Sequence, residues 1–516
     1  MKLATPTSFV VTLPPPTPNG GLHVGHLSGP FLSADAFSRA ARLQGSKVFT
    51  SCYSDVNQSY VRVTALRQKR DPHELADHWT NDIVATLDEA SIEVDDYFPV
   101  DGASRESVQR LFHDLYARGV LVKKPFPVFR SSLTGEFLDE AGVSGHCPKC
   151  LSQSKCGICE SCSSVNDPST LLNPSVTLTG EKTLRVEQVE VMVLELERFR
   201  QNIASVYERN PRFRPRFRWV VEDALKHKLP DFPVTMPGTW GFPVGHADFA
   251  GQVINAWPEI MAQQIYSYKR ALVRDPSLGA QPAFVNFYGF DNAYFYAIVH
   301  AALMTIVDDG RWLPYGALNN EFYNLDHQKF STSNNHAIWS RDLLKRHSTD
   351  AIRFYAAWNH PGFEKANFNE GDMVKVLDRG LRRLWGSIAS QYNARIAGFE
   401  GPAGEASSAA VNVGRAALER IFDGYSLERF HLRQAAEDIL HLMEYIEAQL
   451  RHGDAYLGDV AHLLRCLAVA LVPIAPDAGG ALHQNLAGAP AVRVDERHAL
   501  YLCKLPLALF GERLPS

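Results

Sequence analysis

The sequence predicts an α/β fold in three parts: a doubly wound parallel sheet, an inserted subdomain with paired cysteines, and a C-terminal α-helical bundle. An apolar run at 9–13 precedes a turn-rich segment, a helix-like stretch at 27–43 and a second strand from Val48. Such a strand–helix–strand unit with a short crossover opens a Rossmann-like sheet. Five of the eight cysteines lie between Cys147 and Cys162, and helical periodicity marks residues 372–395, 414–424, 427–452 and 459–473.

The composition is that of an ordinary globular protein. Of its 516 residues, 45% are hydrophobic and 21% are charged, and the formal net charge is −5. This length predicts two to four domains, and the negative charge excludes a global basic field that would recruit nucleic acid. No apolar leader and no run of 18 apolar residues occurs. We therefore expect a cytoplasmic protein without membrane contact.

The motif His23-Val24-Gly25-His26 lies between the first strand and the first helix. Backbone N–H groups and the positive end of a helix can receive phosphate there. Gly25 lets a flat ring approach the backbone, and both histidines can donate to phosphate oxygens. Because Pro30 is tolerated only in a first helical turn, we expect the helix to begin near Ser28. The alternative is a chance turn with surface histidines.

Two carboxylates follow predicted strands. Asp55 lies just past the second strand, where it can anchor a cationic substrate group or merely cap a loop. The apolar runs 252–256 and 283–288 predict two more strands, and the second leads into Gly289-Phe290-Asp291. Asp291 can hold ribose hydroxyls at the carboxyl end of that strand or cap the helix that we expect at 293–307.

The cysteines form paired knuckles. Cys147 and Cys150 make one Cys-x2-Cys pair, and the second pair is Cys156/Cys159 or Cys159/Cys162. Two such pairs about nine residues apart can fold around one tetrahedral Zn²⁺. Four thiolates leave no open coordination position, so the predicted zinc is structural. The ligand set that we adopt is Cys147, Cys150, Cys159 and Cys162, and incidental reduced cysteines are the alternative.

Together these motifs resemble class I aminoacyl-tRNA synthetases, and methionyl-tRNA synthetase in particular, as a divergent paralogue. The resemblance covers nearly the whole chain and depends on motifs in the family's order: Leu13-Pro14 before His-Val-Gly-His, the cysteine knuckles after Phe137-Leu138, Gly289-Phe290-Asp291, Lys329-Phe330-Ser331, Asp350-Ala351-Ile352-Arg353-Phe354-Tyr355 and the helical tail. It implies an ATP-dependent ligase, with Mg²⁺ accompanying ATP, that forms an aminoacyl adenylate and passes the acyl group to tRNA.

The resemblance also assigns roles. His23 and His26 would contact phosphates, Asp291 the ribose, and Asp55 the α-ammonium of the amino acid. Lys329 and its loop would close over the triphosphate. The ATP-binding set then comprises Gly25, Gly289, Asp291, Ser331, Thr332 and Ser333, with His23, His26 and Lys329 as catalytic residues. The implied division is a catalytic domain at 1–124 and 229–330, an inserted connective subdomain with the zinc knuckles at 125–228, a signature loop and stem at 331–371, and an anticodon-binding-like helical bundle at 372–516.

The chain departs from the family at the phosphates and at the amino-acid pocket. Thr332 replaces the family's second loop lysine, which would place a positive charge on the phosphates. We therefore expect that adenylation is slow or that another cation supplies this charge. In the pocket, Leu13 and Pro258 match the family. The positions that differ are Ile254, Trp257, Met261, Asn292 and Tyr296. A buried amide without a partner is costly, so a pocket for a thioether would not need Asn292. We expect a small or polar amino acid instead of methionine.

The residues that would read an anticodon are also replaced. At the family's positions stand Ser387, Gln391, Arg451 and His452, none of which is aromatic apart from the histidine. Because stacking on unpaired bases contributes much of such recognition, tRNA is an unlikely partner.

The predicted function is therefore an amino-acid ligase outside translation with a small-molecule acceptor. Related domains in natural-product pathways acylate an N-hydroxylated amine on the way to a hydrazine, beside a cupin protein, and by that analogy a separate cupin is a candidate partner here. The alternatives are a divergent but genuine methionyl-tRNA synthetase and a catalytically inactive synthetase-like binding protein.

Overall fold

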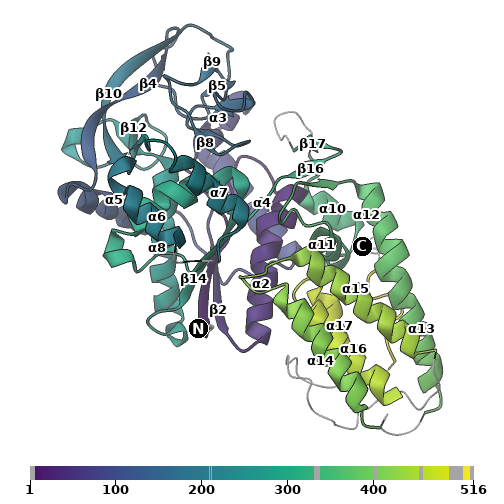
Figure 1. The fold of residues 1–516 in the computed structure, drawn as a ribbon. Helices are drawn as coiled ribbons and strands as arrows, with labels where there is room; N and C mark the ends of the chain where they lie inside the picture. The colour runs from purple at the N-terminus through teal and green to yellow at the C-terminus, as the bar shows by residue number, and fades with distance from the viewer. Residues whose placement is uncertain are drawn as a thin grey trace.

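A five-stranded sheet lies at the centre of the structure, a computed structural model that describes residues 6–208, 210, 212–330, 337–399, 404–451, 457–486 and 504–511 (Figure 1). The strand order is β15-β14-β1-β2-β3 and all neighbours are parallel. The strands are β1 (Ser8–Thr12), β2 (Lys47–Cys52), β3 (Asp96–Tyr97), β14 (Ala283–Gly289) and β15 (Gly316–Asn320). The order reverses at β1, between β2 and β14, and α/β sheets bind ligands at the carboxyl ends of strands beside such a reversal. The predicted doubly wound sheet is confirmed.

Both faces of this sheet are buried. Phe9 and Val11 of β1 point into one core and Val10 into the other. Helices α5 (Gly102–Ala117) and α8 (Ala256–Arg274) cover the Val10 face, whereas α2 (Leu32–Leu43) and the C-terminal helices lie on the opposite side (Figure 1). The prediction of a strand at 252–256 was partly wrong, because β13 (Gln252–Ile254) pairs antiparallel with β12 (Thr235–Pro237) outside this sheet and α8 begins at Ala256.

The helix after the first motif begins earlier than the sequence predicts. Helix α1 (Val24–His26) starts four residues before Ser28, and a π-helical turn, η1 (Leu27–Phe31), joins it to α2. Pro30 lies inside this turn, not in a first helical turn. The wider π turn accommodates a proline, which has no N–H to donate, without ending the helix. The expected start at Ser28 was therefore wrong. A second π turn, η6 (Phe295–His300), followed by α9 (Ala301–Met304), occupies much of the helix expected at 293–307.

A long antiparallel ribbon carries the cysteine-rich region. Strand β4 (Val122–Ser131) pairs with β10 (Leu184–Glu195), and β11 (Asp231–Pro233) adds to the other edge of β10. Between β4 and β10 lie a three-stranded sheet of β5 (Val143–His146), β6 (Gln153–Lys155) and β9 (Leu172–Val176), and a hairpin of β7 (Ile158–Cys159) and β8 (Ser164–Val165). In Figure 1 this ribbon and the C-terminal helices lie on opposite sides of the central sheet.

The C-terminal part is helical, as predicted. Its helices are α12 (Glu370–Leu377), α13 (Arg383–Ile396), α14 (Ser408–Asp423), α15 (Leu432–Gln449), α16 (Leu457–Leu471) and α17 (Pro476–Asn485). The π turn η9 (Asp378–Arg382) connects α12 to α13, and α14 begins six residues before the predicted position 414, where Ser407 caps it. In the described ranges no helix combines the length and apolarity that a membrane crossing requires.

A buried ion pair ties the helices to the sheet domain. Arg353, in α11 (Thr349–Trp358), contacts Asp35 of α2 at 2.5 Å, and both side chains are almost fully buried. The same guanidinium donates to the carbonyls of Ala90 and Pro473. Buried charges of this kind are tolerated because they are paired and hydrogen-bonded.

The remaining elements are α3 (Ser59–Gln68), α4 (Pro72–Glu89), α6 (Arg200–Glu208), α7 (Pro215–Ala224), α10 (Ser340–Arg346), β16 (Tyr323–Leu325), β17 (Gln328–Lys329) and β18 (Ala366–Phe368).

Candidate active site and metal centre

The two histidines of the first motif lie against each other just past β1. His23 caps α1, and its Nδ1 accepts the N–H of Gly25 at 3.1 Å. The backbone N–H of His23 donates to Nδ1 of His26 at 3.3 Å, and the two rings stack with centroids 3.7 Å apart. Since Nδ1 of each ring is an acceptor, the proton of each neutral imidazole is on Nε2. Burial lowers the pKa of His26 to about 4, so this ring is neutral at physiological pH.

The second motif contacts the first, although about 300 residues separate them. The ring of Phe330 stacks on His23 at 4.6 Å with an interplanar angle of 5°. A Cβ on Gly25 would lie 3.0 Å from His23 Cε1 and 3.4 Å from the Phe330 ring, so only glycine fits this site comfortably. The backbone of Lys329 pairs with Asn324 in the β16–β17 hairpin. Ser331, Thr332 and Ser333 lie outside the described residues.

The motif after β14 forms a tight turn at the same carboxyl edge. Asp291 lies in a 3-10 turn, η5 (Phe290–Asn292), and its Oδ1 accepts the amide N–H of Asn292 at 3.1 Å. A Cβ on Gly289 would collide with Asp291 Oδ1, which explains the glycine. The Asn292 side chain is partly exposed and Asp291 is its partner, so the cost of a buried amide without a partner does not arise here. Its presence therefore carries no argument about the substrate.

Asp55 is buried at the end of β2. Its backbone N–H donates to the carbonyl of Pro16 at 3.0 Å, and its carboxylate accepts a long hydrogen bond of 3.4 Å from Gln58. Burial first, and the nearby carboxyl of Glu259 second, hold the pKa of Asp55 well above its usual range. A loop cap does not require this burial, and a buried carboxyl with a raised pKa is typical of functional sites.

Most of the residues expected to contact the amino acid lie near the first turn of α8. Ile254, Met261 and Tyr296 are buried in one core, against which Trp257 packs, whereas Leu13 belongs to the core of the opposite sheet face and Pro258 is buried in α8. The indole of Trp257 stacks on Phe295 at 3.6 Å, and the Tyr296 ring stacks on Tyr288 at 4.0 Å.

Three polar residues near these side chains were not predicted from the sequence. Glu259 is buried next to Pro258, and Tyr53 is buried next to Asp55. Glu140, from the cysteine-rich region, accepts the indole N–H of Trp257 at 2.6 Å, and burial raises its pKa to about 8. The available signal was Glu259 itself, a carboxylate within the otherwise apolar segment Ala-Trp-Pro-Glu-Ile-Met-Ala.

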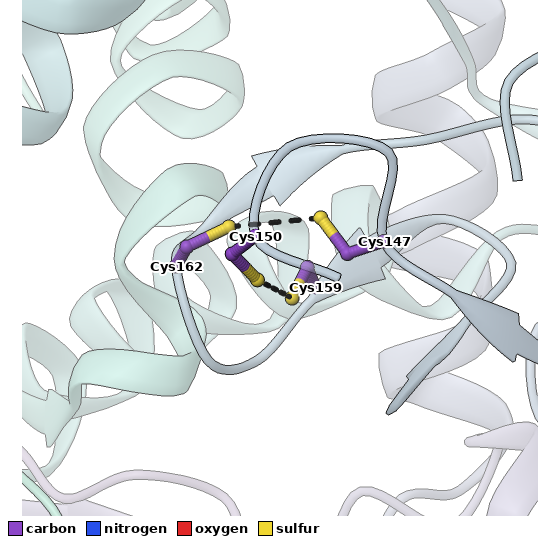
Figure 2. Close-up of side chains that lie close together, drawn as sticks. All are labelled: Cys147, Cys150, Cys159 and Cys162. Carbon is purple, nitrogen blue, oxygen red and sulfur yellow. Dashed lines mark hydrogen bonds between the residues drawn. The ribbon is translucent and has the colours of Figure 1, made fainter. Parts of the chain in front are cut away.

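Four cysteine sulfurs meet in the inserted region, as Figure 2 shows. The sulfurs of Cys147, Cys150, Cys159 and Cys162 all lie within 4.8 Å of one another. Cys147 is 3.8 Å from Cys162, and Cys150 is 3.6 Å from Cys159. Four thiolates around one Zn²⁺ with Zn–S bonds of 2.3 Å would place the sulfurs about 3.8 Å apart. The spacing fits a tetrahedral metal and is far too long for disulfides. Cys156 does not belong to this group of sulfurs.

The cysteine cluster is connected to the active-site edge. Ser163, the neighbour of Cys162, donates its hydroxyl to the carbonyl of Phe290 at 3.0 Å. Arg62 of α3 pairs with Asp139 at 2.7 Å, which holds the inserted region against the sheet domain. A hydrogen bond therefore joins the segment that follows the cysteine cluster to the turn that contains Asp291.

Comparison with known proteins decides the family. Residues 9–392 match the family described as tRNA synthetases class I (M). The chain belongs to this family. It is therefore a ligase of the class I aminoacyl-tRNA synthetase type, as the sequence predicts.

Relatives and solved structures agree with this assignment. The methionine–tRNA ligase of Thermomicrobium roseum is 28% identical over 401 residues, which are 75% of this chain and 68% of the relative. The methionine–tRNA ligase of Streptococcus pneumoniae is 28% identical over 391 residues, or 73% and 70% of the two chains. The fold resembles the Mycobacterium tuberculosis methionyl-tRNA synthetase bound by methionyl-adenylate, with a TM-score of 0.78, 17% identity and coverage of 98% and 100%.

The resemblance assigns four positions to anticodon contact, and three of them lie within the described residues. Ser387 and Gln391 lie one turn apart on α13, and the Gln391 amide donates to the Ser387 hydroxyl at 2.8 Å. Arg451 is exposed just past α15, and His452 lies outside the described residues.

Proposed function

We propose that this ligase activates an amino acid other than methionine as its aminoacyl adenylate. The observation that carries the proposal is the pair of buried carboxyls, Asp55 and Glu259, in a pocket whose family counterpart accepts a thioether. A buried carboxyl without a cationic partner is costly. Asp55 can bind the α-ammonium of any amino acid, but a methionine side chain offers Glu259 nothing to bind. Trp257 also places a large ring where the family has a small residue. A polar amino acid suits this pocket better than methionine.

The proposed step needs positioning and neutralisation of charge. A carboxylate oxygen of the amino acid attacks the α-phosphorus of ATP, and the bond from that phosphorus to the pyrophosphate oxygen breaks. His23 and His26 would donate from Nε2 to phosphate oxygens as negative charge develops, while Asp291 would hold the ribose and Asp55 the α-ammonium. Mg²⁺ bound with ATP would neutralise phosphate charge.

For the second half-reaction we propose a small-molecule acceptor. Support comes from the residues at the anticodon positions, where the family's stacking pair is replaced. The resemblance to domains of natural-product pathways suggests an N-hydroxylated amine as acceptor and a separate cupin protein as partner, on the way to a hydrazine. This step is proposed by family analogy.

For the cysteine cluster we propose one structural Zn²⁺ bound by Cys147, Cys150, Cys159 and Cys162. The sulfur spacing and the thiolate donor set support zinc, and the closed coordination supports a structural role. The metal would fix the loop that carries Ser163 beside the nucleotide-binding turn.

Amino-acid-dependent ATP–pyrophosphate exchange tests the proposed function directly. The assay covers the twenty standard amino acids and several non-standard diamino acids, all without tRNA. We expect exchange with a polar amino acid and none with methionine. Exchange that depends on methionine alone would overturn the proposal. Silence across the whole panel, with and without candidate amines, would favour a catalytically inactive binding protein.

A second candidate is a divergent methionine–tRNA ligase. The relatives named above favour it, because they carry that name and align with about three quarters of this chain. Charging of methionine tRNA in a filter assay is the discriminating measurement. Charging at enzyme concentrations typical of the family would establish this candidate, and its absence together with exchange on another amino acid would exclude it.

Arg216 is our candidate for the cation that compensates for Thr332. Its guanidinium carbon lies 4.3 Å from the ring centre of Phe290, between Gly289 and Asp291, and its Nε lies 3.4 Å from Glu321 just past β15. It therefore stands at the carboxyl edge where the phosphates are expected.

We expect Arg216→Met to slow exchange about tenfold, less than a fully buried donor would, because the side chain is 40% exposed and water screens it. Arg198→Met is a matched control, since Arg198 also lies over a ring, that of Phe199, and pairs with a glutamate, but on the inserted ribbon. Equal rates for the two variants would exclude the compensating role.

A further inference from the structure

Glu259 is a buried carboxyl with one oxygen available. It lies in the first turn of α8 with 3% of its surface exposed. Its Oε1 accepts from the amide of Asn57 at 2.8 Å and from Gln263 at 3.5 Å. Its Oε2 has no hydrogen-bond partner among the described residues. One oxygen is thus held in place, and the other is left for a ligand.

The ionisable groups close to Glu259 are a second carboxyl and a phenol, and not cations. Asp55 lies close enough for the charge of Glu259 to raise its pKa, and both carboxyls act on the phenol of Tyr53 in the same way. The Tyr53 hydroxyl is buried and has no partner within the described part of the chain. No described lysine, arginine or histidine contributes to the pKa of either carboxyl. The cluster is complementary to positive charge.

A purely structural role explains Glu259 less well. An acidic residue in the first helical turn interacts favourably with the helix dipole, but this benefit is available to an exposed side chain. Burial here raises the pKa of Glu259 to about 7, so ionising this carboxyl costs free energy in the protein without a ligand. A carboxyl kept at this cost beside a second one indicates a cationic ligand.

We propose that Glu259 binds a second amino group, carried by the side chain of the substrate, while Asp55 binds the α-ammonium. The substrate class is then a diamino acid. This inference rests on the proposed function, which places the amino acid in this pocket. Two ammonium groups would offset both the repulsion between the carboxylates and the loss of their hydration, which one ammonium cannot do for two separately held oxygens.

Direct binding tests this proposal without requiring catalysis. The probes are L-2,3-diaminopropionate, L-2,4-diaminobutyrate, L-ornithine and L-lysine, each titrated calorimetrically into the full chain, with L-norleucine and L-methionine as uncharged references. We expect at least one diamino acid to bind, Glu259→Gln to weaken it by about 100-fold, and Glu259→Asp to restore part of the affinity. Glu447→Gln, which removes a buried carboxyl from α15, is the control for a general loss of stability and leaves the affinity unchanged.

The pH dependence gives an independent check. Ammonium binding favours the ionised carboxyl, so it releases a proton wherever Glu259 is protonated in the free protein. Affinity for the diamino acid should therefore rise with pH up to about 7, the pKa of Glu259, and the contribution from this group should vanish in Glu259→Gln. Asp55, Tyr53, Glu140 and Tyr296 are the other titratable groups that interact within this cluster, and all four remain in that variant.

The outcomes separate this inference from the proposed function. Binding of a diamino acid that depends on Glu259, without exchange on any amino acid, keeps the inference and overturns the ligase proposal. Exchange on a monoamino acid alone, with no binding of the four diamino acids, keeps the ligase and overturns the inference. Equal weakening of mono- and diamino acids by Glu259→Gln also overturns it, because both carboxyls would then share one ammonium.

Discussion

Replacement of His23 by asparagine is expected to slow amino-acid-dependent ATP–pyrophosphate exchange by about 100-fold or more, the usual effect of removing one donor to a developing oxyanion. The asparagine oxygen can still accept the N–H of Gly25, so the cap of α1 is kept. What is lost is the Nε2–H donor and the ring that stacks on Phe330. The rate of exchange should fall while KM for ATP changes little, because the donor acts mainly in the transition state.

The chain supplies a matched control for this substitution. His246 caps a short 3-10 turn in the same manner, with its Nδ1 accepting the N–H of Asp248 at 3.2 Å, but it lies away from the sheet edge. We expect His246→Asn to leave exchange unchanged and to shift the thermal midpoint no more than His23→Asn does. Comparable losses of rate in the two variants would mean that His23 acts only through folding.

The sheet and its first motif were predictable because local sequence determines them. The run at 9–13 forms β1, the next helix and strand follow, and the register brings His23 to the switch point of the sheet. The start of the helix was not predictable in the same way, because Pro30 excludes an α-helical interior but not a π turn. Helix α8 was missed since its buried residues occupy most of its circumference, which obscures the amphipathic period.

Individual site residues were predictable only where the residue type and its position in the sequence are enough to indicate a role. Cysteine spacing predicted two knuckles around one metal but left the second pair open between Cys156/Cys159 and Cys159/Cys162, and the structure brings the latter into the cluster. The stacking of Phe330 on His23 was not predicted. Partners were not predictable, because they depend on how side chains turn in three dimensions. The side-chain amide of Asn292 is paired with the adjacent Asp291, whereas Glu259 Oε2 and the Tyr53 hydroxyl have no partner among the described residues.

The second large effect is expected at the metal centre. Cys150→Ser should reduce bound zinc from about one ion per chain to nearly none, because three thiolates and a hydroxyl hold Zn²⁺ much more weakly than four thiolates. Cys156→Ser is the control of identical chemistry six residues away, and it should keep the metal, since Cys156 lies outside the sulfur cluster. Metal analysis of both purified variants is the measurement. Equal loss from both would show that the ligand set is wrong, and no zinc in the unsubstituted protein would exclude the site.

Loss of zinc should also lower the rate of ATP–pyrophosphate exchange. Ser163 adjoins Cys162 and donates to the carbonyl of Phe290, which lies between Gly289 and Asp291, so a loosened knuckle leaves the nucleotide-binding turn without this support. We expect Cys150→Ser to slow exchange, and Ser163→Ala to slow it less while retaining zinc. If Cys150→Ser lost its metal and kept its full rate, the knuckle would stabilise only its own region and the hydrogen bond to Phe290 would carry no function. If both variants slow the reaction in the expected order, the inserted region takes part in positioning ATP.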